Sequence, residues 1–274
     1  MRACFLRESA GITLTALPGG PMRLTTNDDE SLDQVAGDWL VFQLRKGHRF
    51  STDDQVVAWR AAAAKPDART VLDLGCGIGS VGLMTLHLLD NPEVPLTGLE
   101  AQELSLGLLR RSLAYNGLED RVTVHLGDLR NSQDALGDAT FDLVTGSPPY
   151  APVGTCLISP HPQKAACRVE LRGSVLDYAA AARRHMHKDS RFAYVMLAAD
   201  ARTEQAAVDA GLTVLERTDI VFRDGSDPLI AVLVCARNED GPFPERVTRR
   251  LTVRDRDGQW TDEYKVVRAG FVGE

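Results

Sequence analysis

The sequence has 274 residues, of which 44% are hydrophobic and 25% are charged, which is ordinary for a soluble globular protein. Its net charge of -7 argues by itself against a protein that binds nucleic acid through overall positive charge. No uninterrupted apolar run approaches the ~20 residues that a membrane span needs. The first 20 residues also lack the long apolar segment of a secretory signal. We therefore expect a cytoplasmic protein without a membrane partner.

The cysteines and histidines predict neither a disulfide scaffold nor a metal site. The five cysteines are odd in number and scattered, and no Cys-x-x-Cys pair is present. Three histidines lack ligand-like spacing with cysteines or carboxylates: His161, His185 and His187. We expect free thiols and no bound metal.

The first third of the chain predicts few elements. Residues 1–36 are rich in Gly, Thr, Pro and acidic residues and suggest a short strand or two with loops. A strand is predicted over 39–44, followed by a helix over 54–64 that Asp53 or Asp54 could cap. Pro66 ends that helix.

From residue 70 onward, apolar strands alternate with helices, which predicts a mainly parallel sheet covered on both faces. The expected fold is α/β, a Rossmann-like seven-stranded sheet whose last two strands, without a clear helix between them, form an antiparallel pair. We expect an N-terminal extension over 1–37, a main domain over 38–240 with its core from 70, and a C-terminal extension over 241–274 packed on the same domain. The predicted strands are 70–75, 95–100, 121–128, 140–146, 191–199, 213–222 and 228–236, and the predicted helices are 80–89, 102–117 and 174–188.

A glycine-rich turn follows the first strand of this core. In 73-DLGCGIGSVGL-83, Gly75, Gly77 and Gly79 let the backbone turn tightly and approach a ligand closely. A Gly-x-Gly-x-Gly run is also found in nucleotide-binding dehydrogenases. Asp73, before the first glycine, argues against these enzymes, because an anion there would repel a pyrophosphate. It suits a cofactor that carries an ammonium group.

Acidic residues also end the next two strands. Glu100 can accept hydrogen bonds from two ribose hydroxyls, and Asp128, followed by Leu129, can accept one from an adenine amine. An amino acid, a ribose and an adenine in strand order predict S-adenosylmethionine as the cofactor.

Two prolines follow the fourth strand of the core, in Ser147-Pro148-Pro149-Tyr150. Prolines fix the backbone and lack an N–H, so this turn can aim its carbonyls at an amine. We expect Ser147 Oγ and the Pro148 carbonyl to accept hydrogen bonds from a planar amine. Tyr150 can then stack on a flipped base.

Together these motifs resemble those of the class I methyltransferases. The Pro-Pro turn is similar to the [Asn/Asp/Ser]-Pro-Pro-[Tyr/Phe/Trp] signature of enzymes that methylate adenine N6, cytosine N4 or a glutamine amide. The resemblance implies that Ser147, Pro148, Pro149 and Tyr150 are catalytic. Asn or Asp is the more frequent first residue for adenine and Ser for cytosine, so adenine N6 and another amine remain alternatives.

The resemblance covers roughly residues 38–270 and extends to one particular family. The lead-in 41-VFQLRKGHRFSTDDQVVAWRA-61 is similar to that of bacterial tRNA(Val) adenine-N6 methyltransferases, which implies that Phe50 and Asp53 lie near the cofactor. The block 165-AACRVELRGSVLDYAAAARRH-185 resembles a second family segment but lacks its His, and the end of the chain, 258–271, resembles the family's end. The resemblance implies a cytoplasmic enzyme with tRNA or another structured RNA as its partner.

We expect the insert 151–167 to form a loop on the substrate side, where Lys164, Arg168 and Arg172 could meet phosphates. N6-methylation of a tRNA adenine is thus the favoured prediction. Two alternatives remain open: methylation of a protein glutamine or of a small-molecule amine, and a module that binds the cofactor without catalysis.

Overall fold

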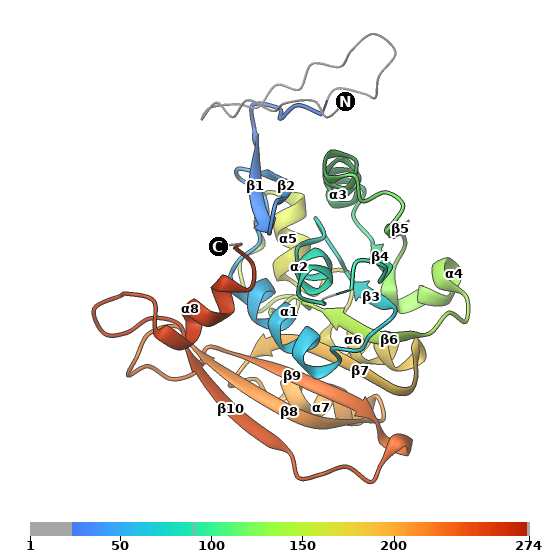
Figure 1. Ribbon diagram of the computed structural model, residues 1–274, viewed down its shortest axis with the longest axis vertical. Helices are drawn as coiled ribbons and strands as arrows, with labels where there is room; N and C mark the ends of the chain where they lie inside the picture. The colour runs from blue at the N-terminus through green and yellow to red at the C-terminus, as the bar shows by residue number, and fades with distance from the viewer. Residues whose placement is uncertain (1–23, 90, 273–274) are drawn as a thin grey trace.

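An eight-stranded sheet forms the centre of the protein, in a computed structural model that describes residues 24–89 and 91–272 (Figure 1). The strand order is β10-β8-β9-β7-β6-β3-β4-β5. The strands are β3 (Val71–Leu74), β4 (Leu96–Glu100), β5 (Val122–Leu126), β6 (Phe141–Gly146), β7 (Met186–Leu197), β8 (Leu212–Val221), β9 (Ile230–Arg237) and β10 (Val247–Thr252).

The α/β, mainly parallel prediction is confirmed, with one difference in strand count. β9 runs antiparallel to both of its neighbours, β7 and β8, as predicted for the last strand of the seven. The eighth strand, β10, comes from the C-terminal extension and pairs in parallel with β8 at the sheet edge. Sequence analysis missed β10 because its residues are mostly exposed, so the segment has no apolar run.

Helices cover both faces of the sheet, and each face has its own apolar cluster. α1, α2, α3 and α8 contribute to one cluster, and α6 and α7 contribute to the other. The helices are α1 (Thr52–Ala64), α2 (Ser80–Leu88), α3 (Glu103–Asn116), α4 (Ser132–Leu136), α5 (Pro162–Arg168), α6 (Val175–Arg184), α7 (Arg202–Asp209) and α8 (Asp262–Ala269), with short 3-10 turns at Leu129–Asn131 and Asn238–Asp240.

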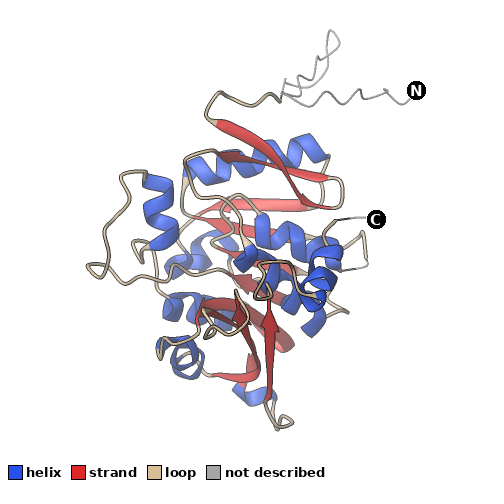
Figure 2. Ribbon diagram, turned by 90° about the vertical axis from the view of Figure 1, so that its left-hand side faces the viewer, coloured by secondary structure: helices blue, strands red, loops and turns tan. Residues whose placement is uncertain are grey.

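A separate hairpin of β1 (Glu30–Ala36) and β2 (Trp39–Leu44) stands apart from the large sheet at the top of Figure 2. It packs on α3: the Phe42 N–H donates to Ser112 Oγ at 3.0 Å, and Asn116 Nδ2 donates to the Leu40 carbonyl at 2.7 Å. The first 23 residues of the predicted N-terminal extension lie outside the described residues. A loop over residues 45–51 connects the hairpin to α1.

Helix boundaries follow local sequence signals. α6 begins at the predicted capping box, in which Ser174 and Asp177 bond each other's backbone N–H, and α3 ends at Gly117 in the left-handed region, φ 67°. Ser51, not Asp53 or Asp54, is the N-cap of α1. Asp54 is the third residue of the helix and accepts from the Ser51 N–H at 2.8 Å. Sequence analysis missed α4, α5 and α7, which have 5, 7 and 8 residues, too few for a clear apolar period.

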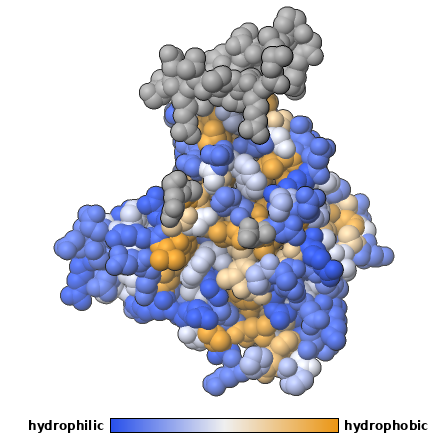
Figure 3. Space-filling view, in the orientation of Figure 1, coloured by the Kyte–Doolittle hydropathy of each residue, from blue (hydrophilic) through white to orange (hydrophobic). Residues whose placement is uncertain are grey.

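The C-terminal residues lie on the outside of the first helix layer. Tyr264 of α8 is fully buried, and its hydroxyl donates to Gln55 Oε1 of α1 at 2.6 Å. Two guanidinium groups contact the Trp260 ring, those of Arg254 at 3.5 Å and Arg268 at 4.9 Å from the ring centre. The projecting loop between β10 and α8, at the left of Figure 3, is mainly hydrophilic. We propose that this extension and the sheet form one folding unit.

Within the described ranges, the structure has no helix long and apolar enough to cross a membrane.

The Tyr264→Ala variant tests the proposed folding unit. Removing a fully buried aromatic side chain leaves a cavity, so we expect unfolding free energy to fall by about 3 to 5 kcal/mol, with a single cooperative transition in denaturant. Val266→Ala is the control, because Val266 lies on the same helix and is 71% exposed. A Tyr264→Ala protein as stable as this control would contradict the proposal.

Candidate active site

A cavity of about 1250 Å³ opens at the carboxyl ends of β3, β4 and β6. Ligands of open α/β sheets bind at this edge because the loops that follow the parallel strands all begin there. The cavity brings together most of the residues that sequence analysis singled out. These lining residues are Phe50, Asp53, Asp73, Gly75, Gly77, Glu100, Leu129, Ser147, Pro148, Pro149, Tyr150, Lys164, Arg168 and Arg172.

The glycine loop has the backbone that a close-fitting cofactor needs. Gly75, Gly77 and Gly79 all have positive φ, at 61°, 56° and 86°. A Cβ on Gly75 would lie 2.1 Å from the Tyr178 hydroxyl, whereas one on Gly77 would meet only the Gly75 carbonyl at 3.9 Å. Gly75 is therefore required by protein packing, and Gly77 leaves open space on the cavity side. Gly79 does not line the cavity; it is the N-cap of α2.

Asp73 lies beneath the loop and ties three elements together. Its side chain accepts from Thr145 Oγ1 of β6 at 2.8 Å and from the Gly82 N–H of α2 at 2.9 Å. The residue is 1% exposed, and burial raises its pKa to about 7. Asp73 thus holds the loop in place, and in its ionised form it places a negative charge at the floor of the cavity.

Glu100, which we propose as the ribose acceptor, ends β4 and lines the cavity. One carboxylate oxygen accepts from the Gly77 N–H at 2.8 Å, and the other accepts from the Gln102 N–H at 2.7 Å. These bonds fix the carboxylate against the glycine loop. Burial raises the pKa of Glu100 from its ordinary value, although both bonds act to lower it.

Sequence analysis missed the part that Asp54 and Tyr178 take in the cavity. Asp54 was considered only as a helix cap, but it is a second buried acid whose pKa burial raises to about 7. The Ser80 side chain at the start of α2 acts in the opposite direction and lowers the pKa of Asp54. Tyr178 lines the cavity from α6. In the sequence, Asp54 had only an ordinary capping pattern and Tyr178 only an apolar helix period.

Asp128 does not join the main cavity. It forms a 2.5 Å ion pair with Arg130, caps the short 3-10 turn, and lines a smaller neighbouring cavity of about 410 Å³. Its neighbour Leu129 does line the main cavity. Asp128 can contact the adenine amine only if the adenine end of the cofactor reaches the second cavity, and we propose that it does.

The Pro-Pro turn lines the same cavity. Pro148 and Pro149 are buried, and within the described residues no hydrogen bond occupies Ser147 Oγ or the Pro148 carbonyl. Tyr150 donates from its hydroxyl to Asp53 Oδ2 at 2.6 Å. This bond joins the turn after β6 to the first turn of α1.

Arg202, which sequence analysis also missed, holds the Pro-Pro turn at Tyr150. Its guanidinium donates to the Tyr150 carbonyl at 3.2 Å and pairs with Glu170 at 2.6 Å and Asp200 at 2.5 Å. Glu170 belongs to the sequence block that resembles a family segment, which was the one available signal. The contact with Tyr150 spans 52 residues and has no local pattern in the sequence.

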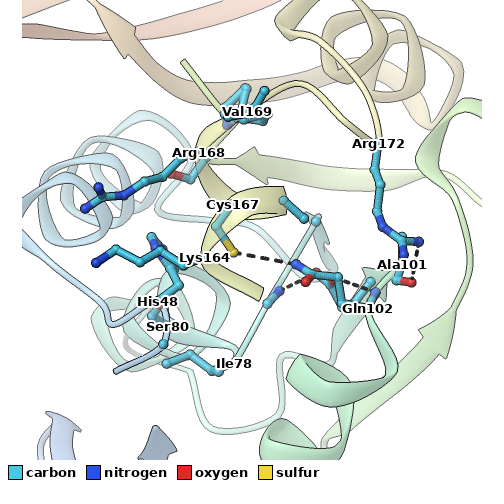
Figure 4. A pocket seen from close by; sticks show the side chains of 18 of the residues that line it. His48, Ile78, Ser80, Ala101, Gln102, Lys164, Cys167, Arg168, Val169 and Arg172 are labelled. Carbon is cyan, nitrogen blue, oxygen red and sulfur yellow. Dashed lines mark hydrogen bonds between the residues drawn. The ribbon is translucent and has the colours of Figure 1, made fainter. Parts of the chain in front are cut away.

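The three predicted phosphate-binding cations divide into two groups (Figure 4). Lys164 and Arg168 extend on the side of His48. Arg172 lies on the other side, where it donates to the Ala101 carbonyl at 3.0 Å. It also lines the second cavity with Asp128. Arg172 therefore lies near the proposed ribose and adenine end, not with Lys164 and Arg168.

These residues fit S-adenosylmethionine. When ionised, the buried acids Asp54, Asp73 and Glu100 give the inner cavity a negative charge that suits a sulfonium and an ammonium group. We propose that Glu100 accepts from the ribose hydroxyls, and Gly77 leaves room for close approach. When bound, the cofactor would supply an electrophilic methyl group.

Residues 60–155 match the family described as Methyltransferase small domain. A tRNA1(Val) (adenine(37)-N6)-methyltransferase of Salmonella enteritidis is 26% identical over 78% of this chain and 83% of its own. Its relative of the same name in Salmonella typhimurium is 25% identical over the same shares. The crystal structure of a predicted O-methyltransferase from Agrobacterium tumefaciens superposes with a TM-score of 0.58 at 18% identity, covering 81% of this chain and 98% of the other.

The fold is thus that of the class I methyltransferases. Fold, cavity and sequence matches together identify the chain as an S-adenosylmethionine-dependent methyltransferase, as the sequence motifs predicted.

Glu100→Ala should weaken the binding of S-adenosylhomocysteine by at least about tenfold, since hydrogen bonds to a charged acceptor contribute roughly 1.5 to 3 kcal/mol. Asp128→Ala is the informative comparison, because Asp128 lies outside the main cavity and should change the affinity less. Isothermal titration calorimetry measures both. Unchanged affinity in Glu100→Ala would refute its assignment to the ribose.

Cofactor affinity should also depend on pH. Asp54 and Asp73 have pKa values of about 7 in the folded protein, against about 4 for an unfolded carboxyl. The folded protein therefore holds more protons between these values, and these groups make it less stable as pH rises through that window. A bound cation favours the ionised carboxylates, so S-adenosylmethionine should bind more tightly as pH is raised from about 6 to about 7.5.

Calorimetric titrations across that range test this dependence, with Asp73→Asn as the comparison. The variant should show a flatter profile because one titrating carboxyl is gone. Equal affinity at every pH in the unmodified protein would contradict the raised pKa values.

Proposed function

We propose that the protein transfers a methyl group from S-adenosylmethionine to the N6 amine of an adenine in tRNA. The observation that carries the proposal is the Ser147–Tyr150 turn, which lines the same cavity as the glycine loop and Glu100. The names of the similar Salmonella enzymes support tRNA adenine as the acceptor. A cytoplasmic location, where tRNA is found, accompanies this proposal.

The residues of the turn would prepare the amine. Ser147 Oγ and the Pro148 carbonyl accept its two N–H bonds, which orients the nitrogen lone pair toward the methyl carbon. The new N–C bond forms as the C–S bond breaks, and the electron pair of that bond stays on sulfur. The nitrogen then releases one proton to solvent, so no strongly basic side chain is needed.

Tyr150 would hold the base by stacking. Its ring is partly exposed and lines the cavity, while its hydroxyl is bonded to Asp53. Arg202 holds the Tyr150 backbone by donating to its carbonyl at 3.2 Å. An extrahelical base could therefore enter between the turn and the cofactor, as in other enzymes that act on a single base.

The experiment is methyl transfer from labelled S-adenosylmethionine to tRNA prepared from a strain that lacks the gene, with a protein extract of that strain as the second acceptor. We expect label in tRNA, recovered as N6-methyladenosine. Label in a protein or metabolite fraction with none in RNA would instead support a glutamine amide or a small amine, which Ser147 also suits.

Two variants of Tyr150 separate stacking from hydrogen bonding. Base–aromatic stacking contributes about 1 to 3 kcal/mol, so Tyr150→Ala should lower turnover on tRNA by roughly 5- to 150-fold. Tyr150→Phe keeps the ring and should retain most of the activity. Cofactor affinity, measured in both variants, should change little in Tyr150→Ala; equal activity of the two variants would rule out stacking.

A further inference from the structure

Six cationic side chains from the described part of the chain line the cavity, although the chain as a whole has a net charge of -7. Two of them have protein partners: Arg49 pairs with Asp33 at 3.1 Å, and Arg172 donates to the Ala101 carbonyl. The other four take part in no ion pair within residues 24–89 and 91–272: Arg45, Lys46, Lys164 and Arg168. Arg45, Lys46 and Arg168 are also exposed. We call these four residues the basic rim.

The basic rim comes from two distant segments that a buried glutamine joins. Arg45 and Lys46 lie in the loop between β2 and α1, and Lys164 and Arg168 lie on α5. Gln163 of α5 is 1% exposed; its Oε1 accepts from the His48 N–H at 3.0 Å, and its Nε2 donates to Ser105 Oγ at 3.1 Å. The loop and α5 therefore form one surface.

The rim is attached directly to the Pro-Pro turn. The Ala151 N–H donates to the Arg168 carbonyl at 3.1 Å, and the Glu170 N–H donates to the Ala151 carbonyl at 3.0 Å. These bonds place the end of α5 next to Tyr150. Figure 4 shows Lys164 and Arg168 on the His48 side of the cavity and Arg172 across it.

Acidic side chains lie deep in the cavity, and basic side chains lie at its rim. The acids at the floor, Asp73 and Glu100, are buried, whereas the cations of the rim reach solvent. Arg168 and Lys164 add to burial in lowering the pKa of His48, which agrees with a positive potential at this rim. Leu157 of the insert, which also lines the cavity, is 100% exposed, so an apolar side chain is available to a large partner there.

We propose that the basic rim binds the phosphate backbone of RNA beside the nucleotide whose base enters the cavity. The proposal rests on the tRNA function above and names the surface that holds the RNA. Unpaired arginines and lysines bind phosphates without reading sequence, and they release counterions when they do so. Arg172 lies outside this surface, on the cofactor side.

The double variant Arg45→Glu/Lys46→Glu tests the rim, because within the described residues neither side chain forms a hydrogen bond with the glycine loop or the Pro-Pro turn. We expect roughly a tenfold or larger rise in KM for tRNA, with the S-adenosylhomocysteine affinity unchanged. A plot of log affinity for tRNA against log salt concentration should become shallower by about 1 for each phosphate that the variant no longer binds. Arg168→Glu should act in the same direction.

The matched control is Arg110→Glu/Lys188→Glu, which changes charge equally at two exposed positions outside the cavity. It should leave KM and the salt dependence near those of the unmodified protein. An equal loss in both double variants would show a general charge effect and overturn the proposal, as would an unchanged KM in Arg45→Glu/Lys46→Glu. A protein that does not methylate tRNA at all would instead refute the proposed function.

Discussion

The site depends on the buried carboxylate of Asp73. Placed at the end of β3, it accepts from Thr145 on the neighbouring strand β6 and from the backbone of α2. These bonds fix the glycine loop relative to the strand that leads into the Pro-Pro turn. Burying a carboxylate is unfavourable unless hydrogen bonds compensate, and its raised pKa records that cost. Asp73 thus fixes the glycine loop relative to the Pro-Pro turn. When ionised, it also places a negative charge at the floor of the cavity.

A second set of contacts joins the Pro-Pro turn to α1 and to Arg202. Tyr150 bonds Asp53 of α1, and Arg202 bonds the Tyr150 carbonyl. Because Gln163 joins the β2–α1 loop to α5, the same region carries the basic rim. The cavity therefore has an anionic interior suited to a cationic cofactor and a cationic rim suited to a polyanionic substrate, on a protein whose total charge is negative.

Much of this arrangement could be predicted because it depends on local sequence. The strand-to-helix turn at Gly75–Gly79, the capping box at Ser174, and the apolar runs of β3 and β6 all have short-range signatures. Parallel strands bring their carboxyl ends to one edge, so Asp73, Glu100 and Ser147 could be placed together from their positions alone.

What could not be predicted depends on contacts between distant residues. The local sequence does not indicate that Arg202 bonds Tyr150, that Gln163 holds His48, or that β10 joins the sheet. Arg172 shows the same limit, since its position next to Lys164 and Arg168 in sequence suggested a shared role, whereas the turn before α6 directs it to the opposite side. Asp128 was predicted to end its strand, but β5 ends at Leu126, and Asp128 pairs with Arg130 and lines the smaller cavity.

The central claim is that this cavity methylates the N6 amine of a tRNA adenine. Nucleoside mass spectrometry of tRNA purified from strains with and without the gene tests it most directly, with the gene restored in one culture as the unmodified form and in another as Ser147→Ala. The account predicts that N6-methyladenosine in one tRNA is lost with the gene, returns with the unmodified form, and is reduced with the variant. An unchanged N6-methyladenosine content in every tRNA of the strain without the gene would contradict it.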